Sequence, residues 1–111
     1  MSESEQITID DFMKVELKVA KILEVSEIEG ADRLLKLRVD LGAEQRQLVA
    51  GIKKSYAPDE LVGRHIVVVS NLKPAKLRGE ESQGMLLAAQ TDDGPALVSF
   101  DKDVPLGAVV K

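Results

Sequence analysis

Residues 70–85 read SNLKPAKLRGEESQGM and separate two apolar runs, Ile66–Val69 and Met85–Ala89. Each run has the length and apolar content of a buried β-strand. The basic residues of the segment are Lys73, Lys76 and Arg78. Pro74 biases the residue before it toward an extended backbone. We therefore predict a rigid, irregular, basic loop between two strands, a feature that suits an anionic ligand.

The segment is compatible with two other interpretations. The same pattern is compatible with a β-hairpin that carries a solvated cluster of charges. Gly79 and Gly84 also have the Gly-x-x-x-x-Gly spacing of a phosphate-binding loop. Such a loop continues with Lys and then Ser or Thr, whereas Met85 and Leu86 follow here. Nucleotide hydrolysis at this loop is therefore excluded.

The size and composition of the chain indicate one domain. Its 111 residues suffice for an apolar core without disulfides or metals. The absence of cysteine excludes disulfides and thiolate metal sites and favours a reducing compartment, so we expect a cytoplasmic protein. No apolar run approaches the roughly 18 residues of a membrane span, and the acidic residues 1–6 do not resemble a signal peptide.

Charge is distributed unevenly along the chain. The net charge is −4, but residues 33–78 hold ten basic residues and four acidic ones, a net +6. Residues 1–11 carry four acidic residues and no base. An acidic protein with a concentrated basic segment can bind a polyanion while its non-specific binding stays low.

The order of the predicted elements is that of the OB-fold. Apolar and polar residues alternate through most of the predicted strands, and the long first strand contains at least one slip of period, which predicts a bulge. We predict an all-β, five-stranded Greek-key barrel with a short helical insert and a C-terminal extension. The alternatives are a small sandwich or another barrel. The predicted strands are 15–28, 35–41, 45–50, 65–69 and 85–89, with helical material in 53–61 and a turn at 92–94.

The chain divides into a leader, a barrel and an extension. We expect residues 1–6 to form a flexible acidic leader and residues 7–91 to form the barrel. Residues 92–111 form an extension of the same domain that is rich in apolar side chains. Because five strands already close a barrel, we expect part of the extension to contact a second copy across a two-fold axis.

Aromatic residues are scarce, and this bears on the mode of binding. They are Phe12, Tyr56 and Phe100. We expect Phe12 to pack inward from a helical turn that Thr8 or Asp10 caps. Proteins that bind single strands usually stack successive bases on several aromatic side chains. Their scarcity here favours recognition of a nucleic-acid backbone and folded shape.

Six short motifs occur in a specific order and spacing. They are DDFxKVxLxVA from Asp10, ADRLLKL from Ala31, VAGI from Val49, LVGR from Leu61, NLKP from Asn71 and SQGM from Ser82. From about Ile7 to its last residue the chain resembles the tRNA-binding domain found at the C-terminus of many bacterial methionyl-tRNA synthetases. The same domain occurs in free dimeric tRNA-binding proteins and in the synthetase-associated cytokine precursor of animals.

The resemblance implies an OB-fold, usually homodimeric, that binds tRNA by shape with little sequence preference. It also implies either a free-standing protein or a synthetase domain that assists aminoacylation. The methionine-activating motifs are absent, so the chain alone is not expected to be an enzyme, and no cofactor is expected. The alternative is an export-related chaperone family of the same fold that holds peptides in a dimer groove. The basic segment 33–78 favours RNA, because peptide capture requires a more apolar groove.

The resemblance also implies a set of RNA-binding residues. Its central residues are Asn71, Lys73, Lys76, Arg78, Ser82 and Met85, and they are bordered by Arg33, Lys36, Lys53 and Lys54. The three bases of the 70–85 segment are interpreted as phosphate contacts. Ser82 and Gln83 are interpreted either as contacts to ribose or bases or as turn caps. Asn71 also suits a turn, and core packing is the simpler role for Met85.

Catalytic and metal sites have little support in the sequence. His65 is the only histidine, begins an apolar strand and is interpreted as structural. No serine has a plausible base partner. The aspartates of the C-terminal part are Asp92, Asp93, Asp101 and Asp103, and their spacing fits no calcium loop. We therefore assign no catalytic residue and no metal ligand.

Overall fold

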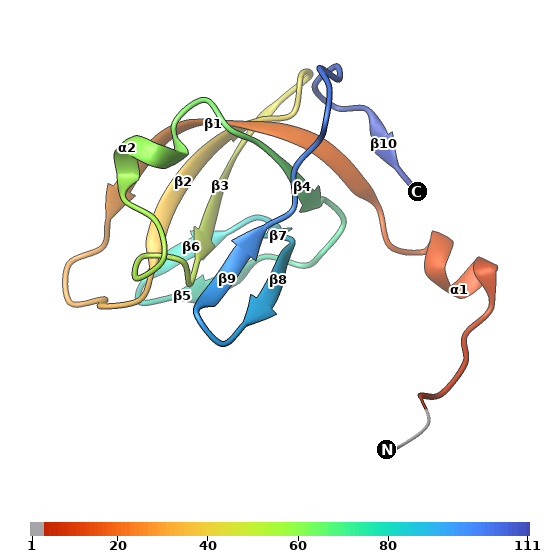
Figure 1. Ribbon diagram of the computed structural model, residues 1–111, viewed down its shortest axis with the longest axis horizontal. Coiled ribbons are helices and arrows are strands. Elements are labelled where there is room, and N and C mark those ends of the chain that lie inside the picture. Colours follow the sequence, from red (N-terminus) through yellow and green to blue (C-terminus); the bar gives the residue numbers. More distant parts are fainter. Residues whose placement is uncertain (1–3) are drawn as a thin grey trace.

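A computed structural model describes residues 4–111 and is dominated by a strongly curled antiparallel sheet (Figure 1). The strands of the sheet are β1 (Leu17–Glu27), β2 (Leu35–Asp40), β3 (Gln45–Ala50), β4 (His65–Val69), β7 (Met85–Leu86) and β10 (Val109–Val110). Their order is β3-β2-β1-β4-β7, and β10 also pairs with β1. In the described part of the chain, no helix is long and apolar enough to cross a membrane. Residues 1–3 of the predicted leader lie outside the described residues.

Two hairpins and two short helices complete the structure. The elements are the hairpins β5 (Ala75–Leu77) with β6 (Glu80–Ser82) and β8 (Ala88–Thr91) with β9 (Gly94–Leu97), and the helices α1 (Ile9–Met13) and α2 (Pro58–Leu61). Figure 1 shows both hairpins at the same end of the curled sheet. Three strands, a helical insert and then further strands is the order that the sequence predicted for an OB-like barrel. The prediction of a mostly β fold of this type is confirmed.

β1 makes the sheet curl because it pairs with different neighbours along its length. Its first half pairs with β4, from Leu17 opposite Val69 to Lys21 opposite His65. Its second half pairs with β2, and the register shifts between Ile22 and Glu24. Such a shift is a β-bulge, which bends a strand and increases its twist. The slip of period in the sequence therefore predicted a real bulge.

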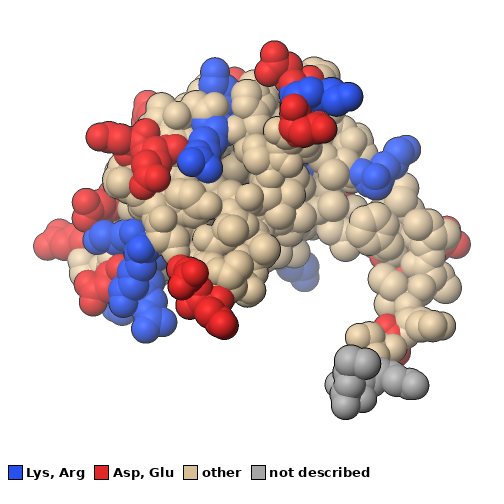
Figure 2. All heavy atoms as spheres, in the orientation of Figure 1, with Lys and Arg blue, Asp and Glu red and all other residues tan. Residues whose placement is uncertain are grey.

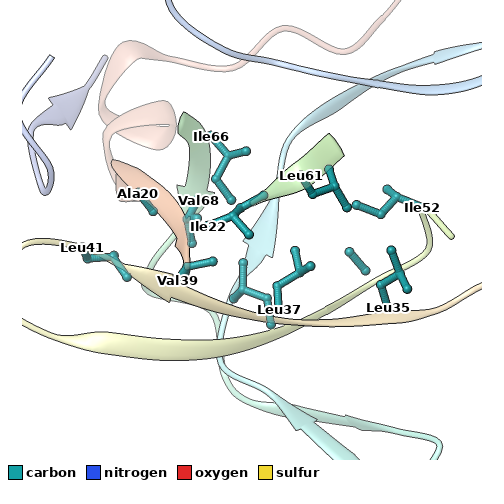
Figure 3. Close-up of a cluster of buried hydrophobic side chains, with 12 residues drawn as sticks. Ala20, Ile22, Leu35, Leu37, Val39, Leu41, Ile52, Leu61, Ile66 and Val68 are labelled. Atoms are coloured by element: carbon teal, nitrogen blue, oxygen red, sulfur yellow. The ribbon is translucent and has the colours of Figure 1, made fainter. Parts of the chain in front are cut away.

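The core fills the inside of the curl (Figure 3). Alternate residues of β2 point inward, and Leu35, Leu37 and Val39 are fully buried. They pack with residues from the other strands, namely Ala20, Ile22, Leu48, Ile66 and Val68. Leu61 of α2 is also fully buried in this cluster. The helical insert therefore contributes to the core between β3 and β4.

The prediction of a single buried fifth strand over residues 85–89 is wrong. Met85 and Leu86 pair with β4, but Ala88 already belongs to β8 and pairs with Leu97. Met85 is 50% exposed. Sequence pattern predicts an extended backbone here but does not identify pairing partners. The chain changes partner at Leu87, whose amide donates to the Val67 carbonyl at 3.1 Å.

The N-terminal arm, residues 7–15, stands away from the barrel (Figure 1). Thr8 caps α1 as predicted, because its Oγ1 accepts a hydrogen bond from the Asp11 amide at 3.1 Å. The prediction that Phe12 packs inward is wrong, since its side chain is 36% exposed. Val15 is also exposed and precedes β1, so the first strand begins later than predicted. Neither residue belongs to a buried hydrophobic cluster of residues 4–111.

The C-terminal extension packs mainly on its own barrel. The Val19 amide donates to the Ala108 carbonyl at 3.0 Å, and the Gly107 amide donates to the Val19 carbonyl at 2.8 Å. Phe100 and Val110 pack against a cluster that includes Leu17. This covering leaves Val98 and Val109 as the exposed large apolar residues of the extension.

Candidate functional site

The basic segment forms a regular hairpin where an irregular loop was predicted. Arg78 and Gly79 link β5 to β6 and have φ angles of 52° and 82°. Two central residues with positive φ are characteristic of the type I′ turn, whose twist matches that of the flanking strands. The hairpin interpretation of the sequence was therefore the correct one for residues 75–82. The turn places Arg78 at the exposed tip of the hairpin.

Three cations of this hairpin and its approach are exposed. They are Lys73, Lys76 and Arg78. Within residues 4–111, none of them lies within 4.0 Å of a carboxylate to form an ion pair. Residues 73–81 also hold Glu80 and Glu81, and Glu81 lies opposite Lys76 in the hairpin register, so three cations and two carboxylates leave a net charge of +1. This excess of positive charge at an exposed hairpin can attract an anion. We name these three residues the basic hairpin triad.

The hairpin is anchored to the free edge of β3 by side chains. The Val49 amide donates to Ser82 Oγ at 2.9 Å, and this hydroxyl donates to the Gly84 carbonyl at 3.0 Å. The backbone amide of Gln47 donates to the side-chain Oε1 of Gln83 at 3.0 Å, and the backbone amide of Gln83 donates to the backbone carbonyl of Gln47 at 2.8 Å. These bonds complete the ladder of an edge strand and give Ser82 and Gln83 structural roles.

Replacing Ser82 with alanine will lower the free energy of unfolding, and we expect it to leave the affinity of the folded protein for RNA, the ligand that the sequence predicts, unchanged. Ser82 is 5% exposed, so the substitution leaves the Val49 amide buried without its acceptor. An unsatisfied buried donor costs about 1–3 kcal/mol. Denaturant unfolding gives the stability, and titration with RNA gives the affinity. Ser82→Thr, which keeps the hydroxyl, is the matched control. A loss of RNA affinity in fully folded Ser82→Ala would instead identify the hydroxyl as an RNA contact.

Arg46 fixes both ends of the basic segment. Its Nη1 donates to the Ser70 carbonyl at 2.5 Å and to the Gln83 carbonyl at 3.2 Å. Its Nε pairs with Glu44, and this hydrogen bond together with the charge of Arg46 lowers the pKa of the Glu44 carboxyl. Arg46 was not among the predicted site residues. It stands alone in a polar strand sequence, so the pattern contained no signal of this role.

Asn71 lies at the start of the segment and joins it to the chain before β1. Its Oδ1 accepts from the Glu16 amide at 2.8 Å, and its Nδ2 donates to the Lys14 carbonyl at 2.7 Å. Next to it, Ser70 Oγ donates to the Glu16 carboxylate at 2.6 Å, which is the main cause of the lowered pKa of Glu16. Asn71 therefore uses both groups of its amide within the protein.

The four bordering bases fall into two classes. Lys36 pairs with Glu80 at 3.4 Å, and Lys53 pairs with Glu27 at 2.9 Å. Arg33 and Lys54 are exposed, and neither forms an ion pair within residues 4–111. Figure 2 shows a group of Lys and Arg side chains beside Asp and Glu at the end of the molecule where Figure 1 draws the loops after β1 and β3. The four bordering basic residues therefore lie among acidic side chains, two of which form ion pairs with them.

An apolar groove of about 540 Å³ runs beside the hairpin. Its lining comes from the end of β3, from residues 72–77 and from the β7–β9 region. Met85 lines this groove, so the prediction of core packing for Met85 is wrong. Leu72 and Leu77, which alternate with the bases of the segment, line it too. Sequence reasoning missed the groove, although apolar residues between bases are a signal for one.

Comparison with a protein-family model gives a match over residues 17–109, to the family described as "Putative tRNA binding domain". A methionine–tRNA ligase of Clostridium tetani is 55% identical over 109 residues. The match covers 96% of this chain and 17% of the ligase, so the chain spans about a sixth of that relative's length.

Solved structures also resemble the chain. A MetRS related protein from Pyrococcus horikoshii is 41% identical, with a TM-score of 0.91 over 97% of this chain and 100% of that one. A CsaA chaperone protein from Picrophilus torridus is 30% identical, with a TM-score of 0.88 over 96% of this chain and 100% of that one. The fold is thus shared by proteins with names of two different functional classes.

Proposed function

The chain belongs to the tRNA-binding domain family, and from this premise we propose that it binds folded tRNA as a homodimer with little sequence preference. The observation that carries the proposal is the basic hairpin triad, which is exposed, lacks ion pairs among the described residues and projects from an anchored hairpin. Lys73 and Lys76 provide point charges for phosphates. Arg78 can hold two phosphate oxygens in a fork.

Recognition by shape is supported by where the aromatic side chains lie. Tyr56 packs against the core, and its hydroxyl accepts from the Leu97 amide at 3.1 Å. Phe100 packs behind β4, and Phe12 lies in the N-terminal arm. None of the three belongs to the hairpin or lines the groove. A surface without stacking aromatics is suited to phosphates and ribose in a folded RNA.

Dimer formation is supported by the N-terminal arm more than by the C-terminal extension. The exposed apolar residues of the arm are Ile7, Ile9, Phe12, Met13 and Val15. A contiguous apolar segment that its own barrel leaves uncovered marks a protein interaction site. A second copy related by a two-fold axis is the commonest solution for such a surface. We propose that the arm, with residues of the 92–111 extension, forms the dimer contact.

The relation to methionine–tRNA ligases suggests how the binding is used. The matched relatives align with the chain over their C-terminal region only. We propose that the chain supplies tRNA affinity in the cytoplasm, either as part of a synthetase or as a separate protein, and does not itself aminoacylate. Peptide binding is the second candidate, because the groove is apolar and a chaperone shares the fold. The basic hairpin triad favours tRNA.

Folded tRNAs of different anticodons will compete about equally for the protein, whereas an unstructured RNA of the same length will compete poorly. The physical reason is that phosphates held at fixed spacing on a folded RNA fit a rigid hairpin, while a flexible strand must first be ordered. Fluorescence anisotropy with one labelled tRNA and unlabelled competitors measures this. Tight binding of the unstructured RNA would refute recognition by shape.

A further inference from the structure

The groove beside the hairpin collects exposed apolar side chains at one place. Leu72, Leu77 and Met85 are each between 40% and 50% exposed, and all three line the groove. Its floor contains the end of β3 and small residues, among them Ala50 and Ala88. Exposed apolar groups that converge in this way mark a binding site for an apolar surface. The volume of about 540 Å³ lies within the range of small-ligand sites, about 300–1,000 Å³.

The charges around the groove indicate what kind of ligand carries that apolar surface. Within residues 4–111, Lys73 is the one charged residue that lines the groove, and no Asp or Glu of that range lines it. Ala75 and Leu77 of the hairpin line the groove, so Lys76 between them projects from the opposite face of the hairpin, where Glu81 is its cross-strand neighbour. An anion that carries a flat apolar group satisfies both features, with its charge at Lys73 and its apolar face in the groove. A nucleotide has this construction, because each phosphate is linked through ribose to a base.

We propose that this groove is a subsite for one unpaired nucleobase of the bound RNA, next to the phosphates held by the basic hairpin triad. The proposal rests on the proposed tRNA binding and adds a second element to it. A base within an RNA helix is stacked and inaccessible, whereas a base in a loop or at a single-stranded end can be turned outward. Gln90, which is exposed and lines the groove, offers an amide to the edge of such a base.

An apolar peptide is the other occupant that the groove's lining permits. Lys73 at the wall gives no advantage to an uncharged apolar side chain. Lys73, in a lining without a carboxylate of residues 4–111, favours an occupant with a negative charge close to its apolar part. A phosphate next to a base meets that requirement. RNA is therefore the occupant that the charges favour.

The test uses a short RNA duplex with and without one unpaired nucleotide at its end, the unpaired base being 2-aminopurine. In the full chain, Leu77→Thr with Met85→Gln removes apolar surface while keeping a strand former and a side chain of similar length. Val62→Thr is the matched control, since Val62 is 53% exposed and lies outside the groove lining. Circular dichroism and thermal unfolding establish that each variant is folded.

We expect the double variant to bind the RNA with the unpaired base roughly tenfold more weakly, as partial loss of two apolar contacts implies. Its affinity for the blunt duplex and its salt dependence will be unchanged, because no phosphate contact is lost. The 2-aminopurine fluorescence will change on binding to the wild-type protein and to Val62→Thr, and much less with the double variant.

Equal affinity for the two RNAs in wild type, or equal effects of the groove and control variants, would overturn the subsite. Salt-dependent binding of both RNAs in that case would leave the proposed function intact. Absence of salt-dependent RNA binding would refute the proposed function itself. A further outcome would also overturn the proposal: an apolar peptide binds the wild-type protein but not the double variant, while the affinity for RNA is the same in both. The groove would then be a peptide-binding site.

Discussion

Replacing Lys73 and Lys76 with glutamine and Arg78 with asparagine will weaken binding to every tRNA roughly hundredfold in moderate salt and will flatten its salt dependence. Each phosphate contact contributes about 0.7–0.9 to the slope of log affinity against log salt, so three lost contacts lower the slope by roughly 2–3. The loss is uniform across tRNAs because phosphates carry no sequence. Anisotropy titrations at several salt concentrations measure both quantities.

The choice of asparagine at position 78 follows from the backbone. Arg78 has a φ angle of 52°, a conformation that asparagine tolerates well and that type I′ turns use. The substitution thus removes the charge and keeps the hairpin. Neutralising three bases outside the site, Lys21, Lys102 and Lys111, is the control for net charge. If the control weakens binding as much as the triad variant, the attraction is a property of the whole molecule and the hairpin is not the site.

Alternation and turn residues in the sequence predicted the elements that depend on local pattern. β2 and β3 are examples, since Leu35, Leu37 and Val39 alternate with polar residues and glycines mark the turns. The bulge in β1 was also visible, because a slip in period reflects one unpaired residue. These features depend on neighbours in the chain, and the family motifs added the order of the strands.

The site was harder to predict because its geometry depends on residues far apart in the sequence. In the sequence, Ser82 and Gln83 look like free polar groups. In the structure, both side chains accept hydrogen bonds from backbone amides of β3, which lies more than thirty positions earlier in the chain. Arg46 holds the segment at both ends through backbone carbonyls, which carry no sequence signal. The basic hairpin triad remains free among the described residues because it projects from the anchored base. Charge clustering therefore identified exposed cations, whose contacts with phosphates stay a prediction, whereas the hydrogen bonds of Ser82 and Gln83 to β3 could not be read from the sequence.

The exposed position of Phe12 bears on how the proposed dimer forms. An apolar helical turn normally packs on its own domain, but α1 stands away from the barrel and leaves its apolar residues uncovered (Figure 1). The extension, by contrast, is attached to its own barrel by backbone hydrogen bonds of Val19 with Gly107 and Ala108. Deleting residues 95–111 would expose the cluster of Leu17, Val67 and Val69, so that truncation is expected to unfold the chain. The arm is therefore the better place to test for a dimer.

Substituting serine for Ile9 and Met13 is expected to convert the proposed dimer into a folded monomer and to weaken tRNA binding by about a hundredfold. These residues lie four apart on one face of α1, and Ile9 is 71% exposed, so the barrel loses nothing by the change. A single basic hairpin triad then meets the tRNA, where a dimer presents two. Loss of linked binding typically costs a factor of about 10²–10⁴ when both sites can engage together.

Light scattering on the intact chain and on the variant gives the two masses, and the same samples serve for the tRNA titration. Val62→Ser is the control, because it alters an exposed apolar residue of the body and leaves the arm intact. The control must remain dimeric and bind as the wild type does. Two observations would refute the argument: an intact chain that is monomeric at about ten micromolar and still binds tRNA tightly, or a monomeric variant with undiminished affinity. In the second case the dimer would exist without serving the binding, since one hairpin would already provide all the affinity that the RNA requires.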